Sequence, residues 1–100
     1  MKPSEAIRKG AKLTKGQERG VYYNTSTDRC CAIGAMRIGY MCNENATVKD
    51  KNIAATVDAA GEEMNLWDDY YREYGGTIQD HSDAGISLEE IADRLEVIGY

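Results

Sequence analysis

The sequence predicts a single α+β domain that is dominated by helices, about four of them, with a small β-hairpin near residues 20–31. Apolar residues recur at helical spacing along most of the chain, and one short run, "VYY", has high β propensity and is followed by turn residues. A chain of 100 residues can bury one hydrophobic core but not two. We therefore expect residues 1–100 to form one domain.

The first helix is expected within "PSEAIRKGAKLTKG", residues 3–16. Pro3 and Ser4 are start signals and Gly16 is a stop signal, while Ile7, Gly10, Ala11 and Thr14 have helical spacing. The next segment, "GVYYNTSTDRCC", places Asn, Ser and Asp between two short extended runs. This pattern predicts a hairpin that needs neighbouring helices for stability.

The second helix, "CCAIGAMRIGYM" at residues 30–41, has Arg37 as its one charged residue and is rich in Ala and Gly. Glycine weakens an isolated helix, so Gly34 and Gly39 indicate that another backbone approaches closely. We expect this helix to be the most buried element. Cysteine behaves as a small apolar residue when buried, so core packing is the favoured interpretation of the three cysteines, Cys30, Cys31 and Cys42.

The middle of the chain predicts a polar connection or short turn at residues 43–52 and then a long helix that ends at Gly75 and Gly76. The apolar residues of that helix are spaced by three and four, which predicts a stripe facing the core: Ile53, Val57, Ala60, Met64 and Trp67. Whether the helix breaks at Gly61 or Asn65 stays open at this point.

The last helix has the clearest local signal. Ser87 and Glu90 have the spacing of a capping box, in which each side chain binds the free backbone amide of the other residue. The residues that follow form one apolar face, Leu88, Ile91, Ala92, Leu95 and Ile98, which we expect to pack on residues 32–42. Asp83 is interpreted as a cap at the start of this helix.

The order of these elements carries a resemblance. An N-terminal helix, an aromatic hairpin, "CCAIGAM" and then "IQDHSDAGISLEEIADRL" resemble, over roughly residues 3–98, small uncharacterised proteins of bacteria and their phages that form domains of unknown function. Those relatives typically have Asn-Asp where this chain has Ser82 and Asp83. The resemblance implies a compact α+β domain and a phage or prophage setting, and it implies no established activity.

Charge is distributed unevenly. The net charge is −5, yet residues 1–50 contain nine Lys and Arg against five Asp and Glu, whereas residues 51–100 contain three against twelve. This acidic balance argues against direct nucleic-acid binding, which needs clustered basic residues, and favours a protein partner with a basic surface. The sequence has no apolar run long enough to cross a membrane and no framework of spaced cysteines, so we expect a cytoplasmic protein with reduced thiols.

The acidic half also contains a cluster of aromatic residues. In "WDDYYREY", Trp67, Tyr70, Tyr71 and Tyr74 have helical spacing and are interleaved with acidic residues. These rings could form the edge of the core, or they could anchor a partner, because Tyr and Trp dominate the binding energy of interfaces. The predicted partner-binding residues are Trp67, Asp68, Asp69, Tyr70, Tyr71, Glu73 and Tyr74.

Three function classes follow. The favoured one is an accessory protein, encoded by a phage or prophage, that binds and inhibits a host or defence protein. The second is a cysteine hydrolase or transferase, because Cys30 or Cys31, His81 and Asp83 supply a nucleophile, a base and an orienting acid in the chain order of papain-like enzymes, which they resemble. The third is a self-associating structural protein. No cofactor and no metal are expected, since paired Cys-x-x-Cys spacings are missing.

Overall fold

The structure is a computed structural model that describes residues 1–58 and 65–100. The described residues form six helices and one two-stranded sheet, in the order α1 (Pro3–Leu13), β1 (Tyr23–Asn24), β2 (Arg29–Cys30), α2 (Ala32–Met41), α3 (Val48–Thr56), α4 (Leu66–Tyr74), α5 (Ile78–Asp83) and α6 (Leu88–Val97). The predicted helix-dominated α+β architecture is confirmed. The helix count is higher than the four expected.

Two local caps explain the additional helices. Thr47 and Asp50 bind each other reciprocally, with the Thr47 hydroxyl accepting from the Asp50 N–H at 3.2 Å and the Asp50 carboxylate accepting from the Thr47 N–H at 2.9 Å. Helix α3 therefore begins at Val48, and the expected connection over residues 43–52 is wrong for its second half. Thr77 caps α5 through a single bond, in which its hydroxyl accepts from the Asp80 N–H at 3.0 Å.

The predicted long helix is two shorter helices in the structure, and the predicted apolar stripe is wrong at each of its described positions. Ile53 and Val57 are 54% and 39% exposed and Trp67 is 37% exposed, while Ala60, Gly61 and Met64 lie outside the described residues. Asn65 does mark a break, because it precedes the first residue of α4. Since α3 and α4 are separate helices, each buries a face of its own: Lys51, Ala54 and Ala55 in α3, and Leu66 and Tyr70 in α4.

Close contact between the backbones of α1 and α2 forms the centre of the core. A Cβ atom built on Gly39 of α2 would lie 1.8 Å from the Ala6 carbonyl oxygen, and one on Gly10 of α1 would lie 1.9 Å from the Ala35 carbonyl oxygen. Gly34 makes the same kind of approach to the segment before β1, since its Cβ would lie 1.7 Å from the Tyr22 carbonyl oxygen. Only glycine permits these approaches. The prediction that residues 32–42 form a buried central helix with glycines at backbone contacts is confirmed, since α2 buries seven of its ten residues.

The hairpin is confirmed between residues 20 and 31. Tyr23 pairs with Cys30 in antiparallel register, and the turn is closed by the Asp28 N–H donating to the Asn24 carbonyl at 2.8 Å. Asp28 adopts a left-handed backbone with φ of 54°, and its carboxylate accepts from Lys51 Nζ at 2.9 Å. This buried lysine of α3 thereby fixes the hairpin to the helices.

Helix α6 begins with one half of the expected capping box, in which the Ser87 hydroxyl accepts from the Glu90 N–H at 3.1 Å, while the Glu90 carboxylate lies 3.6 Å from the Arg94 guanidinium. Its predicted apolar face is buried except at Ile98, which is half-buried. This face packs mainly on α1 and touches α2 only at the margin, which differs from the expected packing on residues 32–42. The reason is that α1 lies between the two helices, as its extensive contacts with both show.

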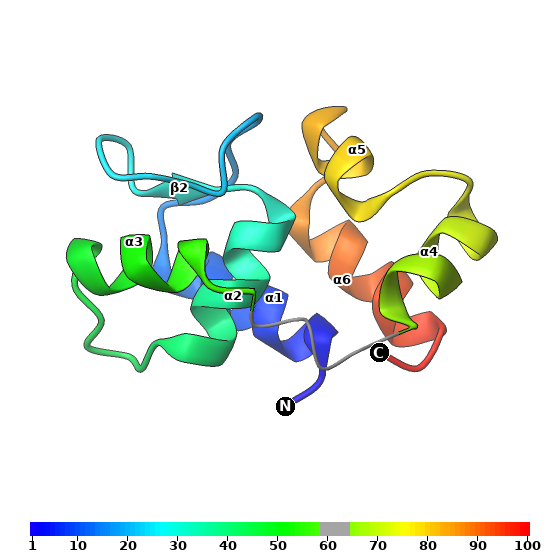
Figure 1. The fold of residues 1–100 in the computed structure, drawn as a ribbon, viewed down its shortest axis with the longest axis horizontal. Coiled ribbons are helices and arrows are strands. Elements are labelled where there is room, and N and C mark those ends of the chain that lie inside the picture. The colour runs from blue at the N-terminus through cyan, green and yellow to red at the C-terminus, as the bar shows by residue number, and fades with distance from the viewer. Residues whose placement is uncertain (59–64) are drawn as a thin grey trace.

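Figure 1 shows how these contacts divide the molecule. Helices α1 and α2 lie in the middle, the hairpin and α3 on one side, and α4, α5 and α6 on the other. The two ends of the chain meet, because the Ser4 N–H and hydroxyl both donate to the Tyr100 carbonyl at 3.0 Å. The central helix α2 thus lies between two groups of elements that are far apart in sequence, and we call these groups the two walls of the molecule: the hairpin with α3, and α4 with α5 and α6.

Candidate functional site

Cys30 is completely buried at the end of the hairpin. Its thiol lies 3.5 Å from the Thr14 hydroxyl and 3.8 Å from the Gly16 carbonyl oxygen. Burial raises the pKa of Cys30 to about 11, an effect that the contact with Thr14 only partly offsets. At neutral pH this sulfur is a protonated thiol packed in the core, which is the opposite of an activated nucleophile.

Cys31 occupies the N-cap of α2, where the helix dipole favours a thiolate. Its sulfur accepts from the Gly34 N–H at 3.4 Å. The side chain is nevertheless only 3% exposed. Burial raises the pKa of the Cys31 thiol, although the hydrogen bond from the Gly34 N–H lowers it. Desolvation therefore outweighs the helix terminus, and Cys31 is also a protonated thiol.

Within the described residues, the His81 side chain makes its hydrogen bonds with α4 and α6 and not with the cysteines. Its Nδ1 lies 2.7 Å from the Tyr70 hydroxyl and 3.1 Å from Arg94 Nη1. Because a guanidinium can only donate, Nδ1 is the acceptor of both groups. His81 of α5 therefore contacts α4 and α6. The structure does not bring the predicted catalytic residues together as a nucleophile and its base.

Ser82 connects α5 to the central helix α2, and Asp83 connects α5 to the loop before the hairpin. The buried Ser82 hydroxyl accepts from the Ala32 N–H at 3.0 Å, which satisfies a free amide in the first turn of α2. Asp83 Oδ1 accepts from the Gly20 N–H at 3.0 Å. Asp83 is therefore the last residue of α5 and binds the loop before the hairpin, which corrects its interpretation as a cap of the last helix.

The seven predicted partner-binding residues divide into two groups. Tyr70 is completely buried and Tyr74 is half-buried, with its hydroxyl donating to the Arg94 carbonyl at 2.8 Å. Asp69 accepts from the Tyr100 hydroxyl at 2.5 Å. The remaining four are exposed, and together with Arg72 they form what we call the α4 surface: Trp67, Asp68, Tyr71, Arg72 and Glu73.

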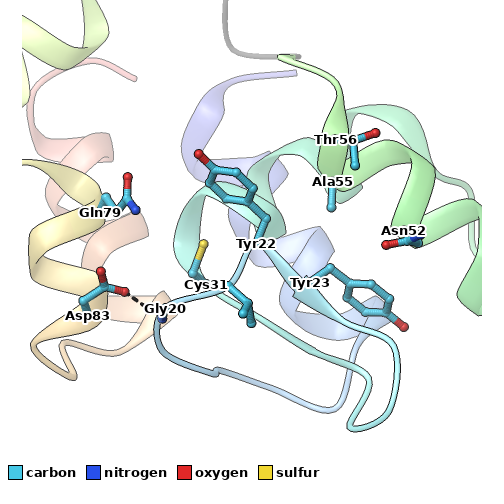
Figure 2. Close-up of a pocket in the computed structure, with 10 residues that line it drawn as sticks. Gly20, Tyr22, Tyr23, Cys31, Asn52, Ala55, Thr56, Gln79 and Asp83 are labelled. Atoms are coloured by element: carbon cyan, nitrogen blue, oxygen red, sulfur yellow. Dashed lines mark hydrogen bonds between the residues drawn. The ribbon is translucent and has the colours of Figure 1, made fainter.

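A hollow of about 460 Å³ opens between the two walls of the molecule. Figure 2 shows Cys31 at its centre, the hairpin residues Tyr22 and Tyr23 and the α3 residues on one side, and Gln79 and Asp83 of α5 on the other. The Tyr22 ring is held in place by Arg37, whose guanidinium lies 4.5 Å from the ring centroid and donates to the Ala55 carbonyl at 2.8 Å.

Sequence reasoning missed most of the residues around this hollow. Tyr22 was part of a predicted strand, and no pattern in the sequence predicts that 42% of this residue is exposed to solvent. Asn52 and Gln79 were not singled out at all, because a lone amide on a short helix carries no pattern. A clue could have come from Asp83, which was recognised for its charge but assigned to the wrong contact.

The described residues contain no group of three or more His, Cys, Asp and Glu side chains that could hold a metal ion. Nor does any helix among them have the length and apolarity that a membrane span requires.

The fold and the site define a small helix-dominated α+β protein that has an exposed aromatic and acidic helix and a hollow lined by both polar and apolar residues. Comparison with protein-family models, with curated proteins and with solved structures gives no match.

Proposed function

We propose that this protein is a small protein-binding module that docks through its α4 surface on a basic partner. One observation carries the proposal: Trp67 and Tyr71, one helical turn apart, remain 37% and 57% exposed next to Asp68 and Glu73. Large aromatic side chains anchor interfaces when they become buried, and the neighbouring carboxylates select a positively charged surface.

The α4 surface is supported by a fixed inner face. Tyr70 is buried beneath it, and its ring packs on Tyr74 with centroids 4.9 Å apart. Tyr74 is bound to α6, and Asp69 is bound to the C-terminal residue Tyr100. A surface that is already ordered loses little conformational entropy on binding, so its contacts contribute more fully to affinity.

The biological setting implied by the resemblance adds to the proposal. The resemblance implies a phage or prophage protein, and an acidic surface suits an inhibitor that occupies a basic site on a host or defence protein. Inhibition and a cytoplasmic location stay predictions. The thiols favour binding over catalysis, because burial raises the pKa of both Cys30 and Cys31.

The experiment is affinity capture from host lysate followed by a binding titration with the purified partner. The test variant carries Asp68→Lys and Glu73→Lys, which reverse two exposed charges of the α4 surface and leave the bonded Asp69 intact. We expect the dissociation constant to rise at least about tenfold in this variant and to rise with salt for the wild type.

The matched control carries Glu5→Lys and Glu44→Lys, two exposed acidic residues on other parts of the molecule that change the net charge by the same amount. It should bind within about twofold of the wild type. Equal binding by all three proteins, or binding that is indifferent to salt, would contradict the proposal. A molecular mass that doubles with concentration and returns to the monomer value in Tyr71→Ala would instead indicate self-association.

A further inference from the structure

A second hollow adjoins the one at Cys31. It has a volume of about 250 Å³ and is lined by Ile33, Trp67, Thr77, Ile78 and Gln79. Gln79 lines both hollows, and the first turn of α2 supplies Cys31 to one and Ile33 to the other. The two hollows therefore share Gln79 as a lining residue, and we call the pair the Gln79 groove, which extends from the hairpin and α3 to the exposed Trp67 of α4.

The two ends of the Gln79 groove differ in chemistry. The end at α4 is mainly apolar, with Ile33, Trp67 and Ile78. The other end contains Asp83, the one charged side chain among the described residues that line the groove. Asp83 Oδ1 is bound to the Gly20 N–H, and the described residues offer no hydrogen bond to Oδ2. The groove thus carries a carboxylate with remaining acceptor capacity and no cation in its lining.

The walls of the groove are held by contacts between distant parts of the chain. Ser82 fixes α5 to α2, and Gln17 Nε2 donates to the Ile86 carbonyl at 2.7 Å. On the opposite wall, Lys51 fixes α3 to the hairpin through Asp28. These bonds order the groove before anything binds, which lowers the entropic cost of occupying it.

We infer that the Gln79 groove binds an extended segment of the basic partner, with a Lys or Arg side chain on Asp83 and a neighbouring apolar side chain against Ile33 and Trp67. Charge complementarity selects this occupant, because a lone carboxylate in a partly enclosed groove attracts a cation, and a charge-assisted hydrogen bond to Oδ2 is stronger than a neutral one. The inference rests on the proposed function and deepens it, since Trp67 belongs to both the groove and the α4 surface.

A defined probe tests the groove without the natural partner. Acetyl-Leu-Arg-amide and acetyl-Arg-Leu-amide cover both chain directions, and acetyl-Leu-Glu-amide is the charge control. In titrations of ¹⁵N-labelled full chain, we expect saturable shift changes at Gly20, Ala32, Ile33 and the Gln79 side-chain amide with an arginine probe only. No saturable change, or equal changes with the glutamate probe, would overturn the inference.

Two variants test whether the positive charge of the arginine probe binds at Asp83. Asp83→Asn removes the charge but retains a side-chain oxygen for the Gly20 N–H, so the fold is expected to persist, as the dispersion of the same spectra will report. Asp80→Asn removes an equal charge from the exposed side of the same short helix. Arginine-probe affinity should fall at least about tenfold in Asp83→Asn and change less than about twofold in Asp80→Asn. Equal losses in both variants would indicate general charge attraction and would contradict the groove.

The same variants separate this inference from the proposed function. If partner binding is lost on reversal of Asp68 and Glu73 but is unchanged in Asp83→Asn, the α4 surface is the interface and the groove inference fails. If both variants lose the partner, both proposals stand. If neither variant loses it, both fail.

Discussion

At the scale of single residues, burial decides the chemistry of the paired cysteines. A cysteine at a helix N-terminus with a histidine later in the chain has the composition of a nucleophilic site. In the fold, Cys30 and Cys31 are desolvated and His81 binds Tyr70 and Arg94. The two cysteines are therefore core residues, and His81 links α4 to α6. Hydrogen-bond geometry, and not the order of residues in the chain, determines a catalytic arrangement.

The raised pKa of Cys30 makes a prediction about alkaline pH. The unfolded thiol ionises near pH 9, whereas the folded thiol keeps its proton to about pH 11, so the unfolded state gains stability between these values. The free energy of unfolding should therefore fall by about 2 kcal/mol from pH 9 to 11, beyond the loss from other groups. Urea unfolding across this range measures it.

Cys30→Ala is the matched variant for the alkaline experiment. It removes the titrating group, so its stability should decline less steeply between pH 9 and 11, even if the small cavity lowers its stability at pH 7. Cys31 and Cys42 keep their raised pKa values in this variant, so part of the slope should remain. Identical slopes for the two proteins would show that Cys30 is not responsible.

At the scale of elements, local caps and close backbone contacts determine the helices. The caps at Thr47, Thr77 and Ser87 each provide a hydroxyl acceptor for a free backbone amide, and a helix follows each of them. Their side chains act within four residues, so such caps can be recognised in a sequence. The contact of α1 with α2 is different, because it depends on small residues that meet only in the folded state.

Gly39→Ala tests that contact. The added Cβ would lie 1.8 Å from the Ala6 carbonyl oxygen, so α1 and α2 must separate, and we expect a loss of about 2 to 3 kcal/mol despite the better helix propensity of alanine. Met41→Ala, at a position on the same helix that is 55% exposed, should change stability by less than about 0.5 kcal/mol. Chemical denaturation compares them, and a neutral Gly39→Ala would disprove the tight packing.

At the scale of the whole molecule, a basic residue of the first half of the chain pairs with acidic residues of the second half. Arg8 of the basic half donates from Nε to Glu89 at 3.1 Å and from Nη2 to Asp93 at 2.6 Å, and it also reaches Glu96 at 3.4 Å. These carboxylates lie on α6 and Arg8 lies on α1. The basic half thus compensates part of the acidic half and orients the two helices.

Arg8→Met should therefore destabilise the protein more at low salt than at high salt. The carboxylates of the network are more than half exposed, so we expect a loss of about 1 kcal/mol at low ionic strength that shrinks by 1 M NaCl as screening removes the attraction. Lys12→Met on the exposed side of α1 is the control and should show little effect. A salt-independent loss in Arg8→Met would indicate that packing, and not charge, links the helices.

Local sequence alone determined the first helix, the hairpin, the buried α2 and the capped α6, because spacing, caps and turn residues act over a few neighbouring positions. The start of α3 is also recorded locally, in the cap of Thr47 and Asp50. Only the tertiary structure decided that Tyr70 turns inward while Tyr71 stays exposed, and that α6 packs on α1. The groove also belongs to the tertiary structure, since Cys31 and Asp83 are brought together by bonds from Ser82 and Gly20. Such contacts join residues more than forty positions apart, and no local pattern records which distant backbone amide a serine or an aspartate will meet.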